Sequence, residues 1–136
     1  MNIEIICVGK LKEKYWQDAI KEYSKRLGRF CTLSVAELKE VRLPYGASAA
    51  EEQKVIYSEG QNILKVLKDD AYVIALDVKG KGLSSKKLAS KIRGLGINGN
   101  SRIAFIIGGS LGLSKEVLDK ADFRLSFSEM TFPHQM

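Results

Sequence analysis

Hydrophobic and polar positions along the chain follow two alternating patterns. Short apolar runs typical of strands occur at residues 3–8, 32–38, 71–76, 103–107 and 123–127. The segments between these runs place apolar residues three or four positions apart, which is the spacing of one helix face. This alternation predicts one α/β domain over residues 1–136, with a mostly parallel sheet flanked by helices.

Three of the helical segments begin at serine residues that suit helix caps. Ser48 is followed three positions later by Glu51, which predicts a capping box in which each side chain binds a free backbone N–H of the other residue. The next helix is expected to begin at Ser84 or Ser85, and the last one at Ser114.

The first helical segment carries an apolar stripe and many basic residues. The stripe is expected to pack on the core, and it consists of Trp16, Ile20, Tyr23 and Leu27. The basic residues begin just after the first strand and are Lys10, Lys12, Lys14, Lys21, Lys25, Arg26 and Arg29. Such a stretch is typical of a surface that tracks a phosphate backbone, and equally of a solvated helix face.

The composition, 45% hydrophobic and 28% charged, is that of an ordinary soluble protein. No apolar run approaches the roughly 20 residues of a membrane helix, and the first residues lack the features of a signal peptide. We therefore expect a cytoplasmic protein with Cys7 and Cys31 reduced and buried. A single histidine without a close cysteine pair argues against a zinc site. The net charge of +6 fits an anionic partner such as RNA and an ordinary basic protein about equally.

Two segments contain glycines that invite comparison with phosphate-binding loops. Residues 108–112 read Gly-Gly-Ser-Leu-Gly after a predicted strand, which is not the G-x-G-x-x-G dinucleotide motif. A tight turn is the favoured interpretation, and close approach of a ligand to bare backbone is the other. Residues 79–82 read Lys-Gly-Lys-Gly and follow Asp77, which is expected to end its strand. They lack the G-x-x-x-x-G-K-[ST] motif and are interpreted as a solvated turn, with a basic rim near bound RNA as the alternative.

Few side chains offer conventional catalytic chemistry. His134, the only histidine, follows Pro133 after the last predicted strand and is either a proton carrier or an ordinary loop residue. Asp77 and Glu129 stand at strand ends, where a carboxylate orients a ribose or caps a loop. No nucleophile–base pair or carboxylate pair is apparent. Methyl transfer from S-adenosylmethionine suits such a chain, because the sulfonium is already electrophilic and the protein mainly aligns the reactants.

The chain resembles a known family over its whole length. The residues that carry the resemblance are Ile74-Ala75-Leu76-Asp77, Ile106-Ile107-Gly108-Gly109 with Gly112, and Thr131-Phe132-Pro133-His134-Gln135. They are similar to those of the ribosomal RNA large subunit methyltransferase H family, which belongs to the SPOUT class. The resemblance implies an α/β fold of SPOUT type whose C-terminal part forms a trefoil knot.

The resemblance also implies a cofactor site and a substrate. Three loops of the family bind S-adenosylmethionine in a bent shape, largely through backbone groups. The matching positions here are Leu76, Gly108, Phe127, Ser128, Glu129, Met130, Thr131 and Phe132. Members of the family act as homodimers and methylate N3 of a pseudouridine in the helix-69 stem-loop of 23S rRNA. The resemblance therefore implies 23S rRNA or the ribosome as the partner, and neither a membrane nor a metal. His134 is the one candidate for a catalytic role.

Family members continue beyond the position of Met136 through a long helix to a basic tail. We expect that the sequence is an incomplete record of a longer polypeptide, and a truncated, inactive domain is the alternative. Two functions are carried forward. The first is an S-adenosylmethionine-dependent rRNA methyltransferase, and the second is a non-catalytic module that binds RNA or the ribosome.

Overall fold

Five strands alternate with four helices in the computed structural model, which describes every residue from Met1 to Met136. The elements are β1 (Asn2–Val8), α1 (Lys14–Leu27), β2 (Thr32–Leu38), α2 (Ala49–Val66), β3 (Tyr72–Gly82), α3 (Ser85–Ile97), β4 (Arg102–Ile107), α4 (Lys115–Lys120) and β5 (Phe123–Ser126). Every strand pairing is parallel, so the predicted α/β class is confirmed.

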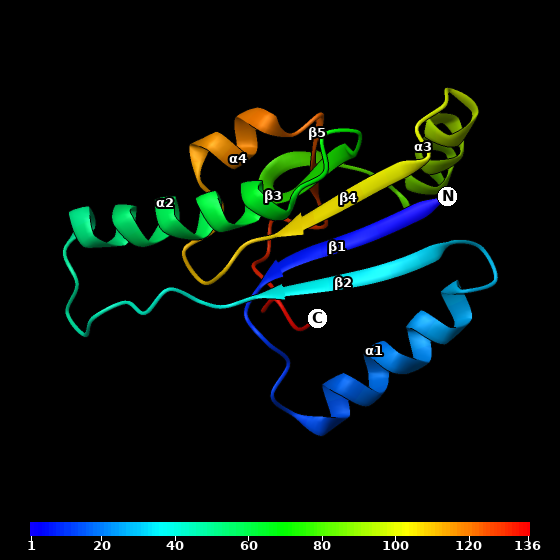
Figure 1. Cartoon of the computed structure of the whole chain (residues 1–136). Coiled ribbons are helices and arrows are strands. Elements are labelled where there is room, and N and C mark those ends of the chain that lie inside the picture. The colour runs from blue at the N-terminus through cyan, green and yellow to red at the C-terminus, as the bar shows by residue number, and fades with distance from the viewer.

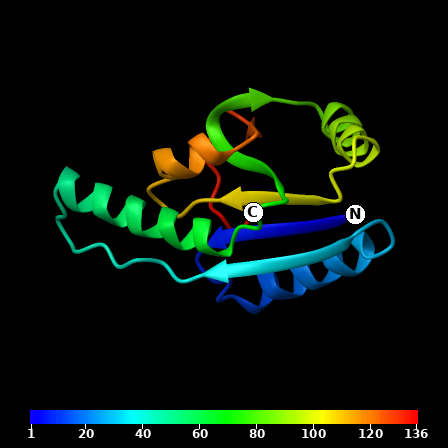
Figure 2. The same ribbon diagram turned by 45° about the horizontal axis from the view of Figure 1, so that its top comes forward.

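The sheet has the strand order β2-β1-β4-β3-β5. The chain moves in one direction across the sheet from β1 to β2 and from β3 to β4, and in the opposite direction from β2 to β3 and from β4 to β5. Right-handed crossovers therefore place α1 and α3 on one face and α2 and α4 on the other. Figures 1 and 2 show α2 and α4 together, with α1 across the sheet from them.

The largest core lies between the sheet and the helices α2 and α4. Ile6 and Ile106 from the sheet meet Ile63 of α2 and Val117 of α4 there, all completely or almost completely buried. A smaller core on the opposite face joins Ile74, Ile103, Leu125 and Leu95. Alternate residues of each strand thus serve different faces, as a sheet covered on both sides requires.

The predicted helix caps are confirmed. Ser48 and Glu51 make the reciprocal capping box at the start of α2. The Ser84 and Ser114 side chains accept hydrogen bonds from the backbone N–H groups of Lys87 and Val117, at the starts of α3 and α4. Each serine holds an N–H that the helix itself leaves unpaired.

The expectation that the apolar stripe of α1 packs in the core is wrong. No residue of α1 is fully buried, and the exposed fractions of Tyr23 and Leu27 are 63% and 41%. The reason is position, because α1 lies against β2 at the edge of the sheet, where little of the molecule surrounds it (Figure 1).

The expected strand end at Asp77 is also wrong, because β3 continues to Gly82 across an irregularity. Leu76 and Lys81 both stand opposite Leu125 of β5, so the residues between them bulge out of the ladder. Within the bulge, the Asp77 carboxylate accepts a hydrogen bond from the Lys79 N–H. The segment 79–82 interpreted as a solvated turn therefore belongs largely to a strand, held there by pairing with β5.

Candidate functional site

Three predicted site segments lie side by side where β4 and β5 end and where β3 reaches its bulge. Leu76 lies in β3 opposite Leu125 of β5, Gly108 follows the last residue of β4, and Phe127 follows the last residue of β5. Because β4, β3 and β5 are neighbours in the sheet, the segments line one edge (Figures 1 and 2). Ligands of open parallel sheets bind at this edge.

The glycine loop after β4 is a tight turn that leaves no room for a side chain at Gly108. Gly112 has φ of +84°, and its N–H donates to the Gly109 carbonyl at 3.0 Å. A Cβ atom on Gly108 would lie 2.8 Å from the carbonyl carbon of Gly112 and 2.9 Å from its oxygen. The tight-turn interpretation is thus confirmed, and the loop presents bare backbone at the sheet edge.

Two residues of α2, Glu59 and Gly60, support this loop. The sequence pattern indicates that Gly60 is either a tolerated weak point of the helix or a point of close packing, and the structure shows close packing, whereas sequence reasoning missed Glu59. A Cβ atom on Gly60 would lie 2.2 Å from Ser114 Oγ, so α2 and the start of α4 touch closely at this glycine. Next to it, Glu59 is only 5% exposed, and a Cβ atom on Gly109 would lie 3.2 Å from Glu59 Oε1. The available signal was the helical spacing of Val55, Glu59 and Ile63, which puts a carboxylate on the buried stripe.

The Glu59 carboxylate lies in an unfavourable environment. Its Oε2 accepts one hydrogen bond, from the Val41 N–H at 3.3 Å, and no lysine, arginine or histidine pairs with it. Burial raises the pKa of Glu59, the Val41 bond lowers this pKa, and the charge of Glu40 raises it further. Burying a carboxylate with so few partners costs folding free energy.

The closing segment after β5 exposes its backbone and its apolar side chains. Ser126 Oγ donates to the Ser128 carbonyl, and the Met130 N–H donates to Ser128 Oγ. The N–H groups of five residues of the segment donate no hydrogen bond within the protein: Phe127, Ser128, Glu129, Thr131 and Phe132. A hollow of about 230 Å³ is lined by Phe127, Phe132 and Met136.

His134 lies against the first strand rather than in this hollow. A Cβ atom on Gly9 would lie 2.9 Å from His134 Nε2, so the imidazole rests on the bare backbone that follows β1. Gly9 has φ of +106°, and its N–H donates to the Leu38 carbonyl. Nε2 is buried without a hydrogen-bond partner. The structure therefore couples the closing segment to β1, while the catalytic role of His134 stays a prediction.

Other side chains add no reactive group to this edge. No cluster of three or more histidine, cysteine, aspartate or glutamate residues is arranged to hold a metal ion. Cys7 and Cys31 form no disulfide, and Cys31 is only partly buried. Burial, and then the charge of Glu37, raises the pKa of the Cys7 thiol, which keeps it protonated. No helix has both the length and the apolar character needed to cross a membrane.

Comparison with known proteins places these features in context. A family model described as Predicted SPOUT methyltransferase matches residues 1–136. Among curated proteins, the ribosomal RNA large subunit methyltransferase H of Alkaliphilus oremlandii is 60% identical to the chain over 136 residues. The proteins of the same name from Clostridium beijerinckii and Clostridium novyi are each 57% identical. Each match covers 100% of this chain and 86% of the relative.

Proposed function

The chain belongs to the SPOUT methyltransferases, and we propose that it methylates N3 of a pseudouridine in the helix-69 stem-loop of 23S rRNA. The observation that carries the ribosomal substrate is the match of all 136 residues to relatives named ribosomal RNA large subunit methyltransferase H. The pseudouridine and its position follow from the family resemblance described above.

S-adenosylmethionine is the methyl donor, and the exposed backbone groups at this edge of the sheet are suited to binding it. We propose that it contacts Leu76, Gly108, Phe127, Ser128, Glu129, Met130, Thr131 and Phe132. Two features support this assignment. The closing segment offers backbone N–H groups that bind nothing in the protein, and Gly108 leaves backbone uncovered beside them. Such groups bind a polar ligand without any charged side chain.

The reaction asks little of the side chains. The bound donor supplies an electrophilic methyl group, and the N3 imide of the base becomes nucleophilic when it loses its proton. The binding segments would hold the reacting atoms in line, which contributes mainly by orientation. His134 is proposed to accept the imide proton. If so, His134→Ala lowers kcat and leaves the affinity for S-adenosylmethionine unchanged, whereas a purely structural role at Gly9 would weaken that affinity as well.

The proposal includes an assembly. Residues 1–136 would form a single SPOUT domain whose C-terminal part is knotted, acting in the cytoplasm as a homodimer on the ribosome. Sedimentation of the purified protein tests the dimer. Transfer of radiolabelled methyl groups to free 23S rRNA and to intact ribosomes tests which of the two is the substrate.

Calorimetry with S-adenosylmethionine separates this function from that of a non-catalytic RNA-binding module. We expect micromolar or tighter binding that Gly108→Val abolishes, because the new side chain would collide with Gly112. Gly94→Ala on α3, where a Cβ atom meets nothing within 4 Å, is the matched control and should bind normally. RNA binding without any affinity for the methyl donor would instead identify the module.

A further inference from the structure

Glu59 of α2 is the only charged residue among the buried residues of the protein. Its side chain lies between the end of β1, the connection from β2 to α2, and the glycine loop. A Cβ atom on Gly109 would meet Glu59 Oε1 at 3.2 Å, Val8 Cγ1 at 3.3 Å and Glu59 Oε2 at 3.4 Å. Both carboxylate oxygens therefore lie next to the Gly109 backbone, with no side chain between them.

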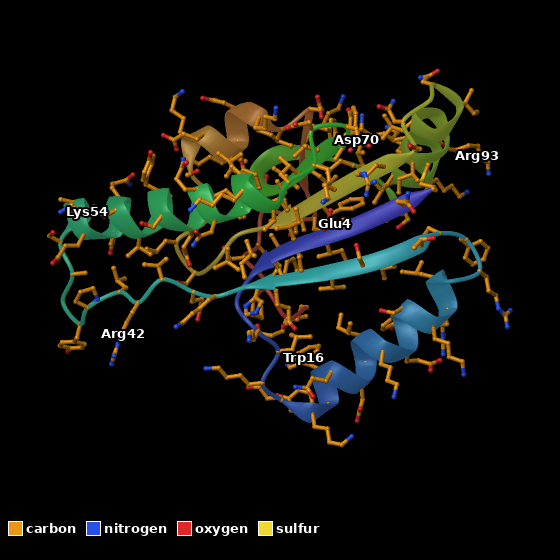
Figure 3. All side chains as sticks on the ribbon, in the orientation of Figure 1. Glu4, Trp16, Arg42, Lys54, Asp70 and Arg93 are labelled. Carbon is orange, nitrogen blue, oxygen red and sulfur yellow. The ribbon has the colours of Figure 1, made fainter.

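No positive charge of the protein balances this carboxylate. The five ion pairs do not include Glu59, and its only hydrogen bond comes from the Val41 N–H. Arg42, the next residue after Val41, is exposed and points away from α2 (Figure 3). Burial, and also the charge of Glu40, raises the pKa of Glu59. The charge that acts on this carboxyl from its surroundings is therefore negative as well.

The structural contacts of Glu59 do not require a charge. Glu59→Gln would keep nearly the same size and an oxygen for the Val41 hydrogen bond, without the cost of burying a charge. An apolar side chain would continue the buried stripe of α2, to which Val55 and Ile63 belong. A lone carboxylate in this place points to a cationic ligand at the glycine loop rather than to the stability of the fold.

The donor and the product of methyl transfer differ in exactly one charge. S-adenosylmethionine carries a positive charge on its sulfur atom. When the bond from sulfur to the methyl carbon breaks, the electron pair stays on sulfur, so S-adenosylhomocysteine has a neutral thioether there. The methyl carbon bonds to the deprotonated nitrogen of the base. Contacts with the adenine, the ribose and the amino-acid group are available to both molecules, so only the methyl group and the charge at sulfur distinguish them.

We propose that Glu59 determines the specificity of the cofactor site for the cationic methyl donor over its neutral product. The carboxylate acts through space, across the bare backbone of Gly109, on a ligand bound at Gly108. Adjacent Cα atoms are about 3.8 Å apart, so the charge is near such a ligand without contacting it. Burial limits the screening by salt, and the attraction favours the cation. This inference rests on the proposed function, in which Gly108 contacts the donor.

Ligands of different charge test the proposal with one variant and two controls. Glu59→Gln removes the charge and keeps the size of the side chain. Glu40→Gln removes the same charge from an exposed neighbour, and Glu59→Asp keeps a carboxylate in the buried position. Calorimetry gives the dissociation constants of S-adenosylmethionine, S-adenosylhomocysteine and sinefungin. In sinefungin, a carbon that bears a protonated amine replaces the sulfonium, so this analogue is cationic without being a methyl donor.

We expect Glu59→Gln to weaken the binding of S-adenosylmethionine and sinefungin about fivefold or more, because only the cationic ligands lose an attraction. The affinity for S-adenosylhomocysteine should change by less than about twofold. Glu40→Gln should change no affinity by more than about twofold, since its exposed charge is screened. Glu59→Asp should lose less of the preference for cations than Glu59→Gln does.

Three results would overturn the role of Glu59. An equal change for all three ligands in Glu59→Gln would show that this side chain only shapes the loop. An equal loss of preference in Glu40→Gln would show that the net charge of the protein is responsible. An equal loss in Glu59→Asp and Glu59→Gln would show that the carboxylate is not what matters.

The same titrations separate this inference from the proposed function. If the wild type binds the donor but transfers no methyl group to RNA, the proposed function fails, and a preference for cations that depends on Glu59 still stands. If the wild type transfers methyl groups and Glu59→Gln leaves the three dissociation constants in their original ratios, only the role of Glu59 fails. If the wild type binds none of the three ligands, both fail.

Discussion

The two faces of the sheet are covered by helices of different character. On one face, Ile63 of α2 and Val117 of α4 pack with Ile6 and Ile106 of the sheet, and all four are at most 1% exposed. On the other face, α1 buries no residue completely and α3 buries only Leu95. The tightly packed layer also carries the seat of the glycine loop, Glu59 and Gly60, whereas the loosely packed layer carries most of the positive charge of the helices.

This contrast in packing predicts a contrast in tolerance to mutation between the layers. A close-packed interior transmits any displacement to its neighbours, so a change beneath the glycine loop should also disturb the loop that we propose to bind the cofactor. Exposed side chains have few contacts to lose, so the loosely packed layer should tolerate substitution well. Mutations of the same chemical kind on the two layers should therefore differ strongly in their effect on stability.

Removing a buried side chain should expose the largest difference. Ile106 is completely buried in the core cluster that includes Ile63 of α2 and Val117 of α4, so Ile106→Ala should lower the free energy of unfolding by about 3–4 kcal/mol. Ile97→Ala at the end of α3, where the side chain is 78% exposed, should change it by less than about 0.5 kcal/mol. Urea unfolding of both variants measures the difference. Similar losses would show that the two layers are equally packed.

Adding a methyl group to a helix glycine should give effects of opposite sign. In Gly60→Ala the new Cβ atom would collide with Ser114 at the start of α4, so we expect a loss of about 2–3 kcal/mol. Gly94→Ala on α3 meets no atom within 4 Å, and the higher helix propensity of alanine should add about 0.5–1 kcal/mol. The shift of the urea midpoint gives both signs directly. A stabilising effect of alanine at both positions would contradict the close contact between Gly60 and Ser114.

The two cap serines offer a finer test. Ser114 is 3% exposed, so Ser114→Ala would leave a buried N–H of Val117 without a partner and cost about 1–2 kcal/mol. Ser84 makes the same kind of bond at the surface, where water replaces it, so Ser84→Ala should cost about 0.5–1 kcal/mol. Thermal unfolding of the pair measures the difference. A larger loss of stability in Ser84→Ala than in Ser114→Ala would contradict the expectation that the cap of α4 is the more important one.

The sequence predicted the parts of the fold that depend on local pattern. The alternation of apolar runs and the serine caps at Ser48, Ser84 and Ser114 depend on neighbours in sequence, and the structure has them all. The apolar stripe of α1 looked like any other, but its burial depends on where the strand order places the helix. That order, with β2 at the edge, is a property of the whole sheet.

The features of the candidate site also divide into those that a local sequence pattern predicts and those that it does not. The turn at Gly108–Gly112 follows from the conformational freedom of glycine, so it was predictable. Close packing at Gly60 was one of two interpretations of the sequence, but the partners that Glu59 and Gly60 meet, Gly109 and Ser114, were not predictable, because they are about fifty residues away in sequence. The contact between His134 and Gly9 joins the two ends of the chain, and no local pattern indicates it.

The smallest expected effect concerns Glu59 and its dependence on pH. Burial, together with the charge of Glu40, raises the pKa of this carboxyl in the folded state despite the Val41 hydrogen bond. Between its pKa in the unfolded chain and the higher pKa in the folded protein, the folded state therefore binds more protons. The free energy of unfolding must then fall as the pH rises through this window, and the loss is complete above the folded pKa.

Glu59→Gln removes that proton equilibrium but keeps the size of the side chain and an oxygen that can accept the Val41 bond. The stability of the variant minus that of the wild type should therefore increase from about pH 4 upward and then become constant. The control is Glu13→Gln at the start of α1, where the side chain is exposed and makes no capping bond, so the difference should stay flat. Urea unfolding from pH 4 to 8 measures both. A difference that grows toward acid would mean that the carboxylate is stabilised in place, and that the tightly packed layer holds a favourable charge rather than a tolerated one.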